Sequence, residues 1–404
     1  MNRPPFWKMD LRTAVTLLLF APGLLQAQWT ALPDWPGSGF DGGYAFVIDD
    51  QVYVGFGQQL QRYDPPTNTW TTQASFPGAG ADRKWANAFV IDGLAYVGMG
   101  IVGNSTFQTD LWAYDPVSDS WSVRASLPAA ARGGSATFTL QGKGYVCGGT
   151  STGPTFSEVF EYDPLADSWT QVSDLPTGPR GFPAAFVLNG KGYVYGGYQS
   201  GFTNETMEVH RFDPLTSTWE QVADLPGPGR QSSVAAVVGG TPIVAMGHTA
   251  FTLGNDDLYA YDPGADAWTL ITQFPGGDRV YPIGAAVGGT FYLGTGNTFS
   301  FVPQKDWWAF DLGTAVQEAE GVGELVLAPN PASDVLTLQI PDERLVGQPA
   351  VLMITDASGR LVRSETLVGS GRSRTFSVAG LPAGCYIVLL TAVRTRYRAR
   401  LLVR

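Results

Sequence analysis

The residues best suited to chemistry in this chain are five arginines that recur at one position of an internal repeat. Each lies 17 residues before a glycine that ends a short apolar run: Arg83, Arg132, Arg180, Arg230 and Arg279. A guanidinium binds carboxylates and phosphates through two parallel hydrogen bonds. If these arginines begin the innermost strands of a closed ring of sheets, they surround one mouth of its channel. They are therefore candidate ligand-binding residues for an anionic group, such as a carboxylate on a sugar or a peptide.

The same arginines have a structural interpretation, which the sequence leaves open. Each could pair with a carboxylate on an adjacent loop, and the candidate partners are Asp110, Glu158, Glu205, Asp257 and Asp306. Regular repetition favours such pairing, because structural roles recur in every repeat whereas a ligand usually needs asymmetry. Phe40 occupies the equivalent position in the first repeat.

Groups that could carry out catalysis are few. Of the two histidines, His210 lies near Glu205 and Glu208, and His248 directly follows Gly247. A cluster of Glu, Arg and His near a channel could transfer protons. However, two histidines cannot build a multi-histidine metal cage, and no zinc-ligand spacing occurs. The sequence thus predicts no catalytic residue, no metal and no cofactor, and it favours a binding role while leaving enzymatic activity open.

Composition and charge narrow the class of protein. The chain has 404 residues with 50 Gly, 28 Pro and 12% aromatic residues, a composition typical of many short strands joined by tight turns. Residues 29–323 carry 12 basic and 29 acidic side chains, whereas residues 324–404 carry ten basic and six acidic ones. This asymmetry indicates separate units, and the net charge of −11 argues against nucleic acid as a partner.

The N-terminal 27 residues have the pattern of a secretory signal peptide. Arg3, Lys8 and Arg12 precede a short apolar run, Val15–Phe20, and Ala27 supplies a small residue at the expected cleavage site. The alternative is a buried N-terminal helix. The run is too short to span a bilayer, and no later stretch reaches the roughly 18 apolar residues of a membrane helix. We expect an exported protein without a transmembrane segment.

The middle of the chain is one unit repeated six times. An aromatic-Asp-Pro turn is followed by Trp six residues after the Asp, in copies centred on Asp64, Asp115, Asp163, Asp213 and Asp262, and a sixth copy at Asp311 lacks the Trp. Successive Asp residues are 51, 48, 50, 49 and 49 positions apart. Each unit also holds two apolar runs joined by hairpin residues such as Asn189-Gly190. Four short antiparallel strands in about 50 residues are typical of a β-propeller blade.

These repeats resemble the kelch-repeat family. The matching residues are Tyr145-Val146 before Gly148-Gly149, Tyr193-Val194 before Gly196-Gly197, and the spaced Tyr and Trp. The resemblance implies an all-β, six-bladed kelch-type β-propeller over residues 28–312. Because some kelch propellers are sugar mutarotases or oxidases, it also implies an alternative to a binding module, namely an extracellular carbohydrate-active enzyme.

The two ends of the repeat region complement each other. In the repeats that carry it, the Trp begins the fourth strand. Trp29 begins such a strand without the three strands that should precede it, and residues 281–311 supply three strands without a fourth. Donation of the N-terminal strand to the last blade would complete both and remove two exposed sheet edges. The loops after the second strand of each blade then open on one face, and they share a phenylalanine: Phe107, Phe156, Phe202, Phe251 and Phe299. These rings could contact a sugar or peptide, or they could pack against the blade.

The C-terminal segment is predicted to be a small β-sandwich, residues 324–404, after a linker at 313–323. It carries Pro329-Asn330-Pro331-Ala332, Asp356-x-x-Gly359-Arg360 and Leu381-Pro382-Ala383-Gly384-x-Tyr386 in this order. These motifs resemble the type A C-terminal sorting domain of the bacterial type IX secretion system. The resemblance implies that residues 324–404 bind the type IX secretion machinery and direct export through the outer membrane of a Bacteroidetes-type bacterium. Arg394, Arg396, Arg398 and Arg400 could form a receptor surface or block edge pairing.

Together these features predict a secreted or cell-surface propeller that binds an unknown extracellular glycan or protein at its loop-rich face.

Overall fold

The computed structural model of the protein consists of two compact units, one with the described residues up to Leu312 and one with those from Gly323 onward. It describes residues 28–250, 253–312, 323–324, 326–330, 332–339, 350–356, 361–367, 373–392 and 395–403. All regular secondary structure in these ranges is β-strand. The predicted signal peptide and, apart from Gly323, the predicted linker lie outside the described residues.

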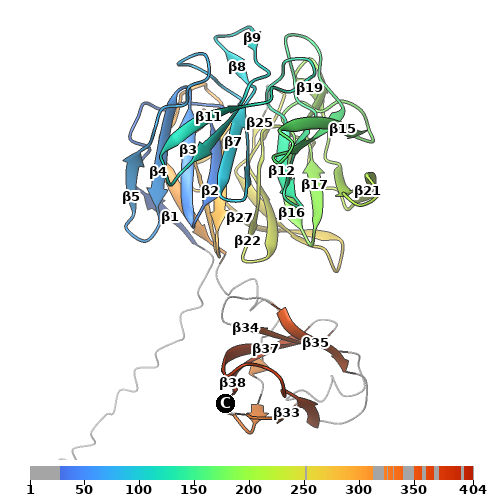
Figure 1. The fold of residues 1–404 in the computed structure, drawn as a ribbon. Helices are drawn as coiled ribbons and strands as arrows, with labels where there is room; N and C mark the ends of the chain where they lie inside the picture. Colours follow the sequence, from blue (N-terminus) through green and yellow to red (C-terminus); the bar gives the residue numbers. More distant parts are fainter. Residues whose placement is uncertain are drawn as a thin grey trace, which may run out of the picture. The chain divides into compact units, whose positions relative to one another are not determined.

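The first unit is built from six four-stranded antiparallel sheets (Figure 1). Blade 1 contains β2 (Tyr44–Ile48), β3 (Gln51–Phe56), β4 (Gln59–Asp64) and β5 (Thr69–Thr72). Blade 2 contains β6 (Asn87–Ile91), β7 (Leu94–Gly98), β10 (Leu111–Asp115) and β11 (Ser120–Arg124), and blade 3 contains β12 (Ala136–Leu140), β13 (Lys143–Cys147), β14 (Glu158–Asp163) and β15 (Ser168–Asp174). Blade 4 contains β16 (Ala184–Leu188), β17 (Lys191–Tyr195), β20 (Val209–Asp213) and β21 (Thr218–Val222), and blade 5 contains β22 (Val234–Val238), β23 (Thr241–Ala245), β26 (Asp257–Asp262) and β27 (Ala267–Gln273). Blade 6 contains β28 (Ile283–Val287), β29 (Thr290–Gly294), β30 (Trp307–Asp311) and β1 (Gln28–Leu32).

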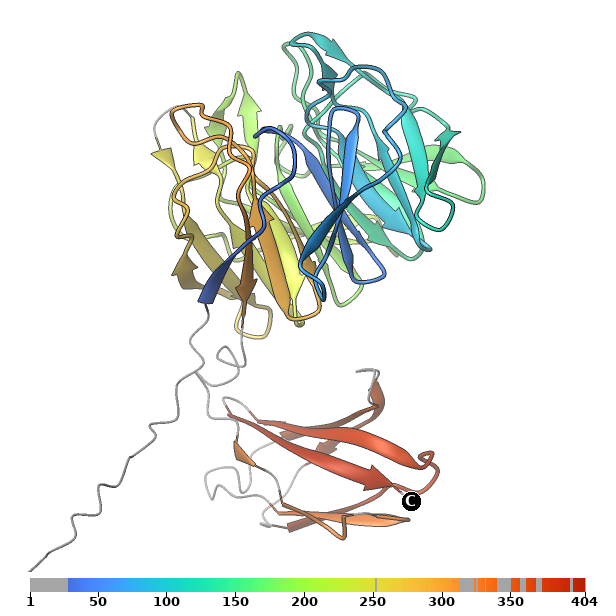
Figure 2. The same cartoon turned by 90° about the vertical axis from the view of Figure 1, so that its left-hand side faces the viewer.

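The sheets close into a ring around a central channel. The first strand of each blade contacts the first strand of the next, and β28 of blade 6 contacts β2 of blade 1. The N-terminal strand β1 completes blade 6 by pairing antiparallel with β30 (Figure 2). Trp29 pairs with Phe310 in the register in which Trp70 pairs with Tyr63 in blade 1. The predicted propeller and its closure by the N-terminal strand are therefore confirmed.

Turn chemistry explains why each blade begins with a hairpin. In blades 1 to 5 both turn residues have positive φ, as in Gln141 (52°) with Gly142 (73°) and Asn189 (50°) with Gly190 (72°). Two positive φ values define the type I′ turn, whose twist matches that of paired strands and which favours Asn and Gly. In blades 1 to 4 the first strand then alternates buried and half-buried residues, because its two faces meet different neighbouring blades.

Aromatic residues link adjacent blades. In blade 2 the Tyr114 hydroxyl donates to Asp119 Oδ1 (2.7 Å), which also accepts the Ala74 N–H of blade 1 (2.8 Å). The Trp121 indole Nε1 donates to Ala74 O (3.0 Å) and packs on Tyr114 with ring centroids 4.9 Å apart. The Tyr and Trp of the repeat thus serve packing, which is where aromatic rings contribute large buried area.

Short hairpins extend from the face on which the second and third strands are joined. They are β8 (Ile101–Val102) with β9 (Thr106–Phe107), β18 (Tyr198–Ser200) with β19 (Thr203–Glu205), and β24 (His248–Thr249) with β25 (Leu253–Gly254). Figure 1 shows β8, β9 and β19 at the upper edge of the ring. This is the loop-rich face.

The second unit is a two-sheet β structure. One sheet has the order β31 (Gly323–Glu324), β38 (Thr395–Val403), β37 (Gly384–Ala392), β34 (Ala350–Asp356), β35 (Leu361–Leu367), and the other has β32 (Val326–Ala328), β33 (Val335–Gln339), β36 (Ser373–Ser377). A shared core includes Leu336, Phe376, Val388 and Leu401. Residues 357–360 of the second sorting-domain motif, and Arg394, lie outside the described residues.

Membrane helices and cysteines complete the description of the fold. Within the described ranges there is no helix that could cross a bilayer. Cys147 is fully buried, and burial raises the pKa of its thiol. The side chain of Cys385 is half-buried.

Candidate functional site

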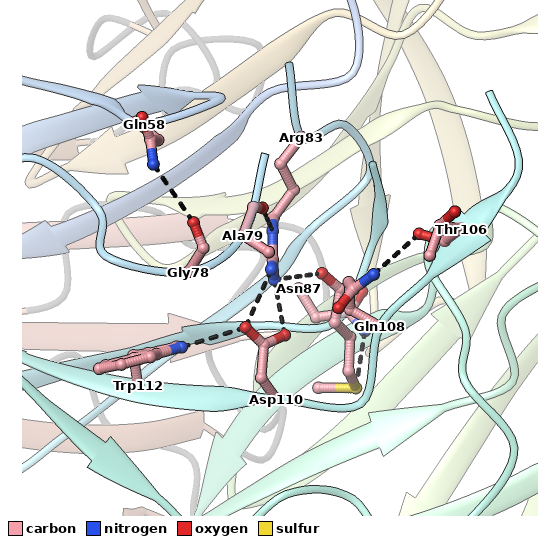
Figure 3. A network of polar contacts seen from close by, with 10 residues as sticks. Gln58, Gly78, Ala79, Arg83, Asn87, Thr106, Gln108, Asp110 and Trp112 are labelled. Atoms are coloured by element: carbon pink, nitrogen blue, oxygen red, sulfur yellow. Dashed lines mark hydrogen bonds and ion pairs between the residues drawn. The ribbon is translucent and has the colours of Figure 1, made fainter. Parts of the chain in front are cut away.

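The five repeated arginines pair with carboxylates of their own blades. Each is no more than 3% exposed. The closest N···O pairs are Arg83 with Asp110 (2.6 Å), Arg132 with Glu158 (3.2 Å), Arg180 with Glu208 (2.5 Å), Arg230 with Asp257, and Arg279 with Asp306 (2.7 Å). In Figure 3 the Arg83 side chain points toward Asp110, which also accepts the Trp112 Nε1–H at 3.0 Å. A buried guanidinium needs such a partner to offset its desolvation.

The arrangement corresponds to the structural interpretation of the arginine column, with one correction. The partner of Arg180 is Glu208 rather than Glu205. In blade 1 the position is apolar, and Phe40 stacks on Phe56 with ring centroids 4.7 Å apart. No described contact leaves a guanidinium of this column facing the channel, so ligand binding by Arg83, Arg132, Arg180, Arg230 and Arg279 stays a prediction without structural support.

The mouth of the channel is formed by the residues two positions after the arginine column. They are Gly42, Trp85, Gly134, Phe182, Ser232 and Tyr281, all with φ between 53° and 69°. Backbone hydrogen bonds connect neighbours around this ring: Trp85 N to Gly42 O (2.7 Å), Gly134 N to Trp85 O (2.9 Å), Phe182 N to Gly134 O (2.8 Å), Ser232 N to Phe182 O (3.0 Å) and Gly42 N to Tyr281 O (3.3 Å). We call these six residues the mouth ring. Left-handed backbone at bulky residues persists only where the surroundings enforce it.

Large and small residues alternate around the mouth ring, and the large ones cover the channel. Trp85, Phe182 and Tyr281 come from blades 2, 4 and 6, yet each pair of rings is in contact, with centroids 4.9 to 5.6 Å apart. The small residues make room for them. A Cβ on Gly42 would lie 2.5 Å from the Trp85 indole, and one on Gly134 would lie 2.5 Å from the Phe182 ring. We call Trp85, Phe182 and Tyr281 the aromatic plug.

The channel below the plug is a polar cavity of about 270 Å³. Its wall consists of the residues that begin the six innermost strands, including the side chains of Asn87, Ser135, Thr137 and Ser233. Asn87 Nδ2 lies 3.2 Å from Ser135 Oγ, and Asn87 Oδ1 accepts the Ser135 N–H at 3.1 Å. These neutral groups offer no strong acid, base or cation to a ligand.

A second cavity of about 100 Å³ opens beside the plug, between blades 4, 5 and 6. It is mainly aromatic and apolar, with two polar side chains, and its lining residues are Phe202, Gln231, His248, Ala250, Val280, Tyr281, Phe299 and Phe301. Phe202 and Phe301 are 36% and 64% exposed and form the rim. Both have left-handed backbone, with φ of 58° and 59°. We call this cavity the aromatic pocket.

Gln231 and His248 give the aromatic pocket its polar wall. Their strand ends pair through backbone hydrogen bonds of 3.0 Å in both directions. The Gln231 amide is oriented by its nitrogen, which donates to Glu205 Oε1 (3.0 Å) and to Phe202 O (3.3 Å). Gln231 Oε1 and His248 Nδ1 are buried, and among the described residues neither has a hydrogen-bond partner. Such atoms are exceptions in folded proteins.

The electrostatics of the aromatic pocket are those of a neutral site. Burial lowers the pKa of His248 to about 4, so its imidazole is uncharged at neutral pH. Burial likewise raises the pKa of the Tyr281 hydroxyl. The Glu205 carboxylate accepts the N–H groups of Gln231 and Ala250, both of which belong to the pocket wall. No arginine or lysine lines the cavity among the residues that the structure describes.

Other candidate groups are dispersed. His210 lies on β20, the third strand of blade 4, where it pairs with Gln221 of the outermost strand, so the two histidines form no joint site. Phe202 and Phe299 line the pocket, whereas Phe156 lies under Arg132, whose guanidinium carbon is 4.0 Å from the ring centroid. Phe107 lies 6.4 Å from Trp85 between ring centroids, and Phe251 lies outside the described residues. Among the described side chains no group of three or more His, Cys, Asp or Glu residues could hold a metal.

The mouth ring and the polar wall were missed from the sequence, although a signal was present. One residue after the arginine column the repeats carry Asp41, Lys84, Gly133, Gly181, Gln231 and Val280, and one residue after the strand-ending glycine they carry Gln58, Ile101, Thr150, Tyr198, His248 and Asn297. The residue types at these two positions differ from blade to blade, whereas the arginine position is Arg in five of the six repeats. A ligand site on a symmetric scaffold needs such differences.

Comparisons with known proteins agree with this architecture. Residues 123–287 match the model of the KLHDC2/KLHL20/DRC7 Kelch-repeats domain, and residues 326–404 match that of the Secretion system C-terminal sorting domain. An N-acetylneuraminate epimerase of Shigella sonnei (strain Ss046) is 32% identical over 153 residues, which cover 36% of this chain and 39% of that protein. The corresponding protein of Escherichia coli (strain K12) is 31% identical over 150 residues, 35% of this chain and 40% of that one. The chain thus spans about two fifths of the length of these curated relatives.

A solved structure described as "Structure of YjhT" superposes with a TM-score of 0.61 at 21% identity and covers 68% of this chain and 95% of that chain. At this identity the likeness concerns the fold, which agrees with the closed ring of sheets. The chain therefore contains a β-propeller that matches a Kelch-repeats domain over residues 123–287, followed by a segment that matches a secretion system C-terminal sorting domain over residues 326–404.

Proposed function

We propose that this protein is an exported carbohydrate-binding propeller that holds part of a sugar in the aromatic pocket. The observation that carries the proposal is the combination of aromatic walls with two buried, unpartnered polar atoms, Gln231 Oε1 and His248 Nδ1. Ligand sites typically combine apolar and aromatic walls with a few polar groups that fix orientation. A sugar has an apolar C–H face for the rings and hydroxyl groups for the polar wall.

The exposed rim explains how a glycan would be held outside the pocket. Phe202 and Phe301 come from loops of blades 4 and 6, and both line the pocket while remaining exposed. Their left-handed backbone indicates that the loops hold the rings in place, since a bulky residue pays for this conformation. Rigid aromatic rings provide contact area at low conformational cost.

A glycan array followed by titration calorimetry on the full chain tests this function. We expect millimolar or tighter binding of at least one saccharide, and Phe301→Ala should weaken it about ten-fold because a stacked ring is worth about 1–3 kcal/mol. Leu165→Ala is the matched control, since Leu165 is 97% exposed on a turn of blade 3. An array without any bound saccharide would contradict the proposal.

The sorting domain carries the second part of the proposal, export to the cell surface or medium by the type IX secretion system. Support comes from the family match over residues 326–404 and from the leader-like pattern of residues 1–27. A fluorescent reporter between residues 1–27 and 313–404, expressed in a type IX-competent bacterium, should appear outside the cell. The same reporter without residues 324–404 should stay in the periplasm, and equal export of both would refute this part.

A second candidate function is sugar epimerisation in the same pocket. The two relatives above are N-acetylneuraminate epimerases, and His248 and Tyr281 form a neutral imidazole and phenol pair with ring centroids 5.4 Å apart. Such a pair could accept and donate protons in ring opening. Exchange NMR of sugar anomers decides between the functions: rate acceleration that is lost in His248→Asn supports the enzyme, and unaccelerated exchange with retained binding supports the binding module.

A further inference from the structure

The polar wall of the aromatic pocket offers one fixed acceptor and one imidazole nitrogen. The acceptor is Gln231 Oε1, because both partners of Gln231 Nε2, namely Glu205 Oε1 and Phe202 O, are themselves acceptors and so determine which way the amide faces. The nitrogen is His248 Nδ1, which in a neutral imidazole either donates or accepts. Gln231 is 1% exposed and His248 8% exposed, so only a group inside the pocket could use these atoms.

The size of the pocket limits what can enter. Its volume of about 100 Å³ is below the ~300 Å³ at which typical small-molecule sites begin. It therefore takes a substituent, while the sugar ring itself stays at the rim formed by Phe202 and Phe301. The interior faces of Tyr281 and Phe299 require this substituent to be partly apolar.

The charge around the pocket disfavours an anion. The arginines of the three surrounding blades are each committed to a carboxylate: Arg180 to Glu208, Arg230 to Asp257 and Arg279 to Asp306. Glu205 contributes a negative charge directly behind the polar wall. A buried carboxylate of a ligand would have no cation to offset its desolvation.

We propose that the aromatic pocket binds the acetamido group of a neutral N-acetylhexosamine. A secondary amide brings one donor for Gln231 Oε1 and one acceptor for the Nδ1–H of the neutral His248 imidazole, and its methyl group contacts the aromatic wall. A hydroxyl group could also donate to one of these atoms and accept from the other, but it has no methyl group to cover the aromatic wall. This inference rests on the proposed saccharide-binding function and specifies the group that the pocket selects.

Titration calorimetry of the full chain against four methyl glycosides or free sugars tests the inference. We expect N-acetylglucosamine to bind about ten-fold more tightly than glucose. N-acetylneuraminate should also bind more weakly than N-acetylglucosamine. Equal affinity for N-acetylglucosamine and glucose would overturn the inference and leave the saccharide-binding function intact. Tighter binding of N-acetylneuraminate than of N-acetylglucosamine would overturn the neutral-ligand assignment. Failure of all sugars, including N-acetylgalactosamine, would overturn both proposals.

Variants identify the atoms concerned. His248→Leu and Gln231→Met should each weaken N-acetylglucosamine binding about ten-fold and leave glucose binding nearly unchanged, and His248→Asn should restore part of the loss because its amide lies near the Nδ1 position. Gln221→Met is the matched control, since Gln221 also donates to a carboxylate, Asp224, at 3.0 Å but on the outermost strand of blade 4. Equal losses for both sugars would contradict the assignment.

Saturation-transfer NMR on the unmodified protein gives a readout that does not depend on folding of a variant. The acetamido methyl protons of N-acetylglucosamine should receive the strongest saturation, because they alone lie inside the aromatic pocket. Stronger saturation of the ring protons than of the methyl group would contradict the inference.

Discussion

The indole of Trp85 and the phenyl ring of Phe182 pack edge to face across the axis of the propeller, with centroids 4.9 Å apart and planes at 83°. Tyr281 completes this contact from blade 6. The three rings separate the polar channel from the loop-rich face, and Tyr281 is also a wall of the aromatic pocket. The pocket and the plug are thus parts of one packed unit.

The small residues between the rings provide the first prediction. Gly134→Ala should lower the free energy of unfolding by more than Gly142→Ala, by about 1 to 3 kcal/mol. Both glycines have positive φ (58° and 73°) and lie in blade 3, so both variants carry the backbone penalty. Only the Gly134 Cβ would meet a ring, at 2.5 Å from Phe182, whereas nothing lies within 4 Å of a Cβ at Gly142.

Urea unfolding followed by tryptophan fluorescence measures this difference. Every tryptophan except Trp7 lies between residues 29 and 308, so the signal reports on the propeller. Equal losses in the two variants would mean that the plug contributes nothing beyond backbone conformation.

The second prediction concerns the buried ion pairs. Asp110→Ala removes the two hydrogen bonds of 2.6 and 2.9 Å to Arg83 and leaves a guanidinium that is 1% exposed without its charge partner. We expect a loss of about 3 kcal/mol. The control is Asp34→Ala, which breaks an exposed pair with Lys305 and should cost less than about 0.5 kcal/mol.

The double variant Arg83→Met with Asp110→Ala removes both charges and should recover part of the loss, as double-mutant cycles of urea unfolding would reveal. If Asp110→Ala is as mild as Asp34→Ala, the arginine column is not held by these pairs.

The third prediction concerns closure of the ring. A chain that begins at residue 33 lacks β1 and exposes the edge of β30, whereas a chain that begins at residue 28 keeps it. Loss of Trp29 alone removes ring contacts of 4.9 Å with both Phe310 and Phe274. We expect the shorter chain to lose at least about 3 kcal/mol of stability and to self-associate through the open edge. Light scattering and urea unfolding would reveal this, and identical behaviour of the two chains would refute closure by β1.

The fourth prediction concerns pH. The pKa of His248 is lowered by burial from 6.5 to about 4, so the unfolded chain takes up a proton first as the pH falls. The contribution of neutral His248 to the free energy of unfolding is complete above pH 6.5 and decreases as the pH falls toward 4. A shift of this size corresponds to about 3 kcal/mol.

The stability difference between pH 7 and pH 4.5 should therefore shrink by about 2 to 3 kcal/mol in His248→Asn relative to the unmodified protein. Carboxylates elsewhere contribute equally to both proteins and cancel in this comparison. An unchanged difference would show that the imidazole is not held neutral.

The sequence by itself determined the repeat, the strands and the closure. Hairpin turns such as Asn189-Gly190, the strand alternation and the register of Trp with its Tyr or Phe are set by residues that are close in the chain, and Trp29 fits the same local pattern as Trp70. Local turn chemistry and side-chain alternation are the part of folding that a linear pattern records.

Only the tertiary structure decided where the site lies. The arginine column correctly indicated the end of the propeller at which the site lies. Its side chains, however, face carboxylates of their own blades, and it is the residues one and two positions later that face the pocket and the mouth. The direction in which each side chain points depends on the left-handed residue just before each innermost strand. This residue reverses the side-chain direction within two positions. The contacts of Trp85, Phe182 and Tyr281 join blades nearly one hundred residues apart, and the ring must close before they exist.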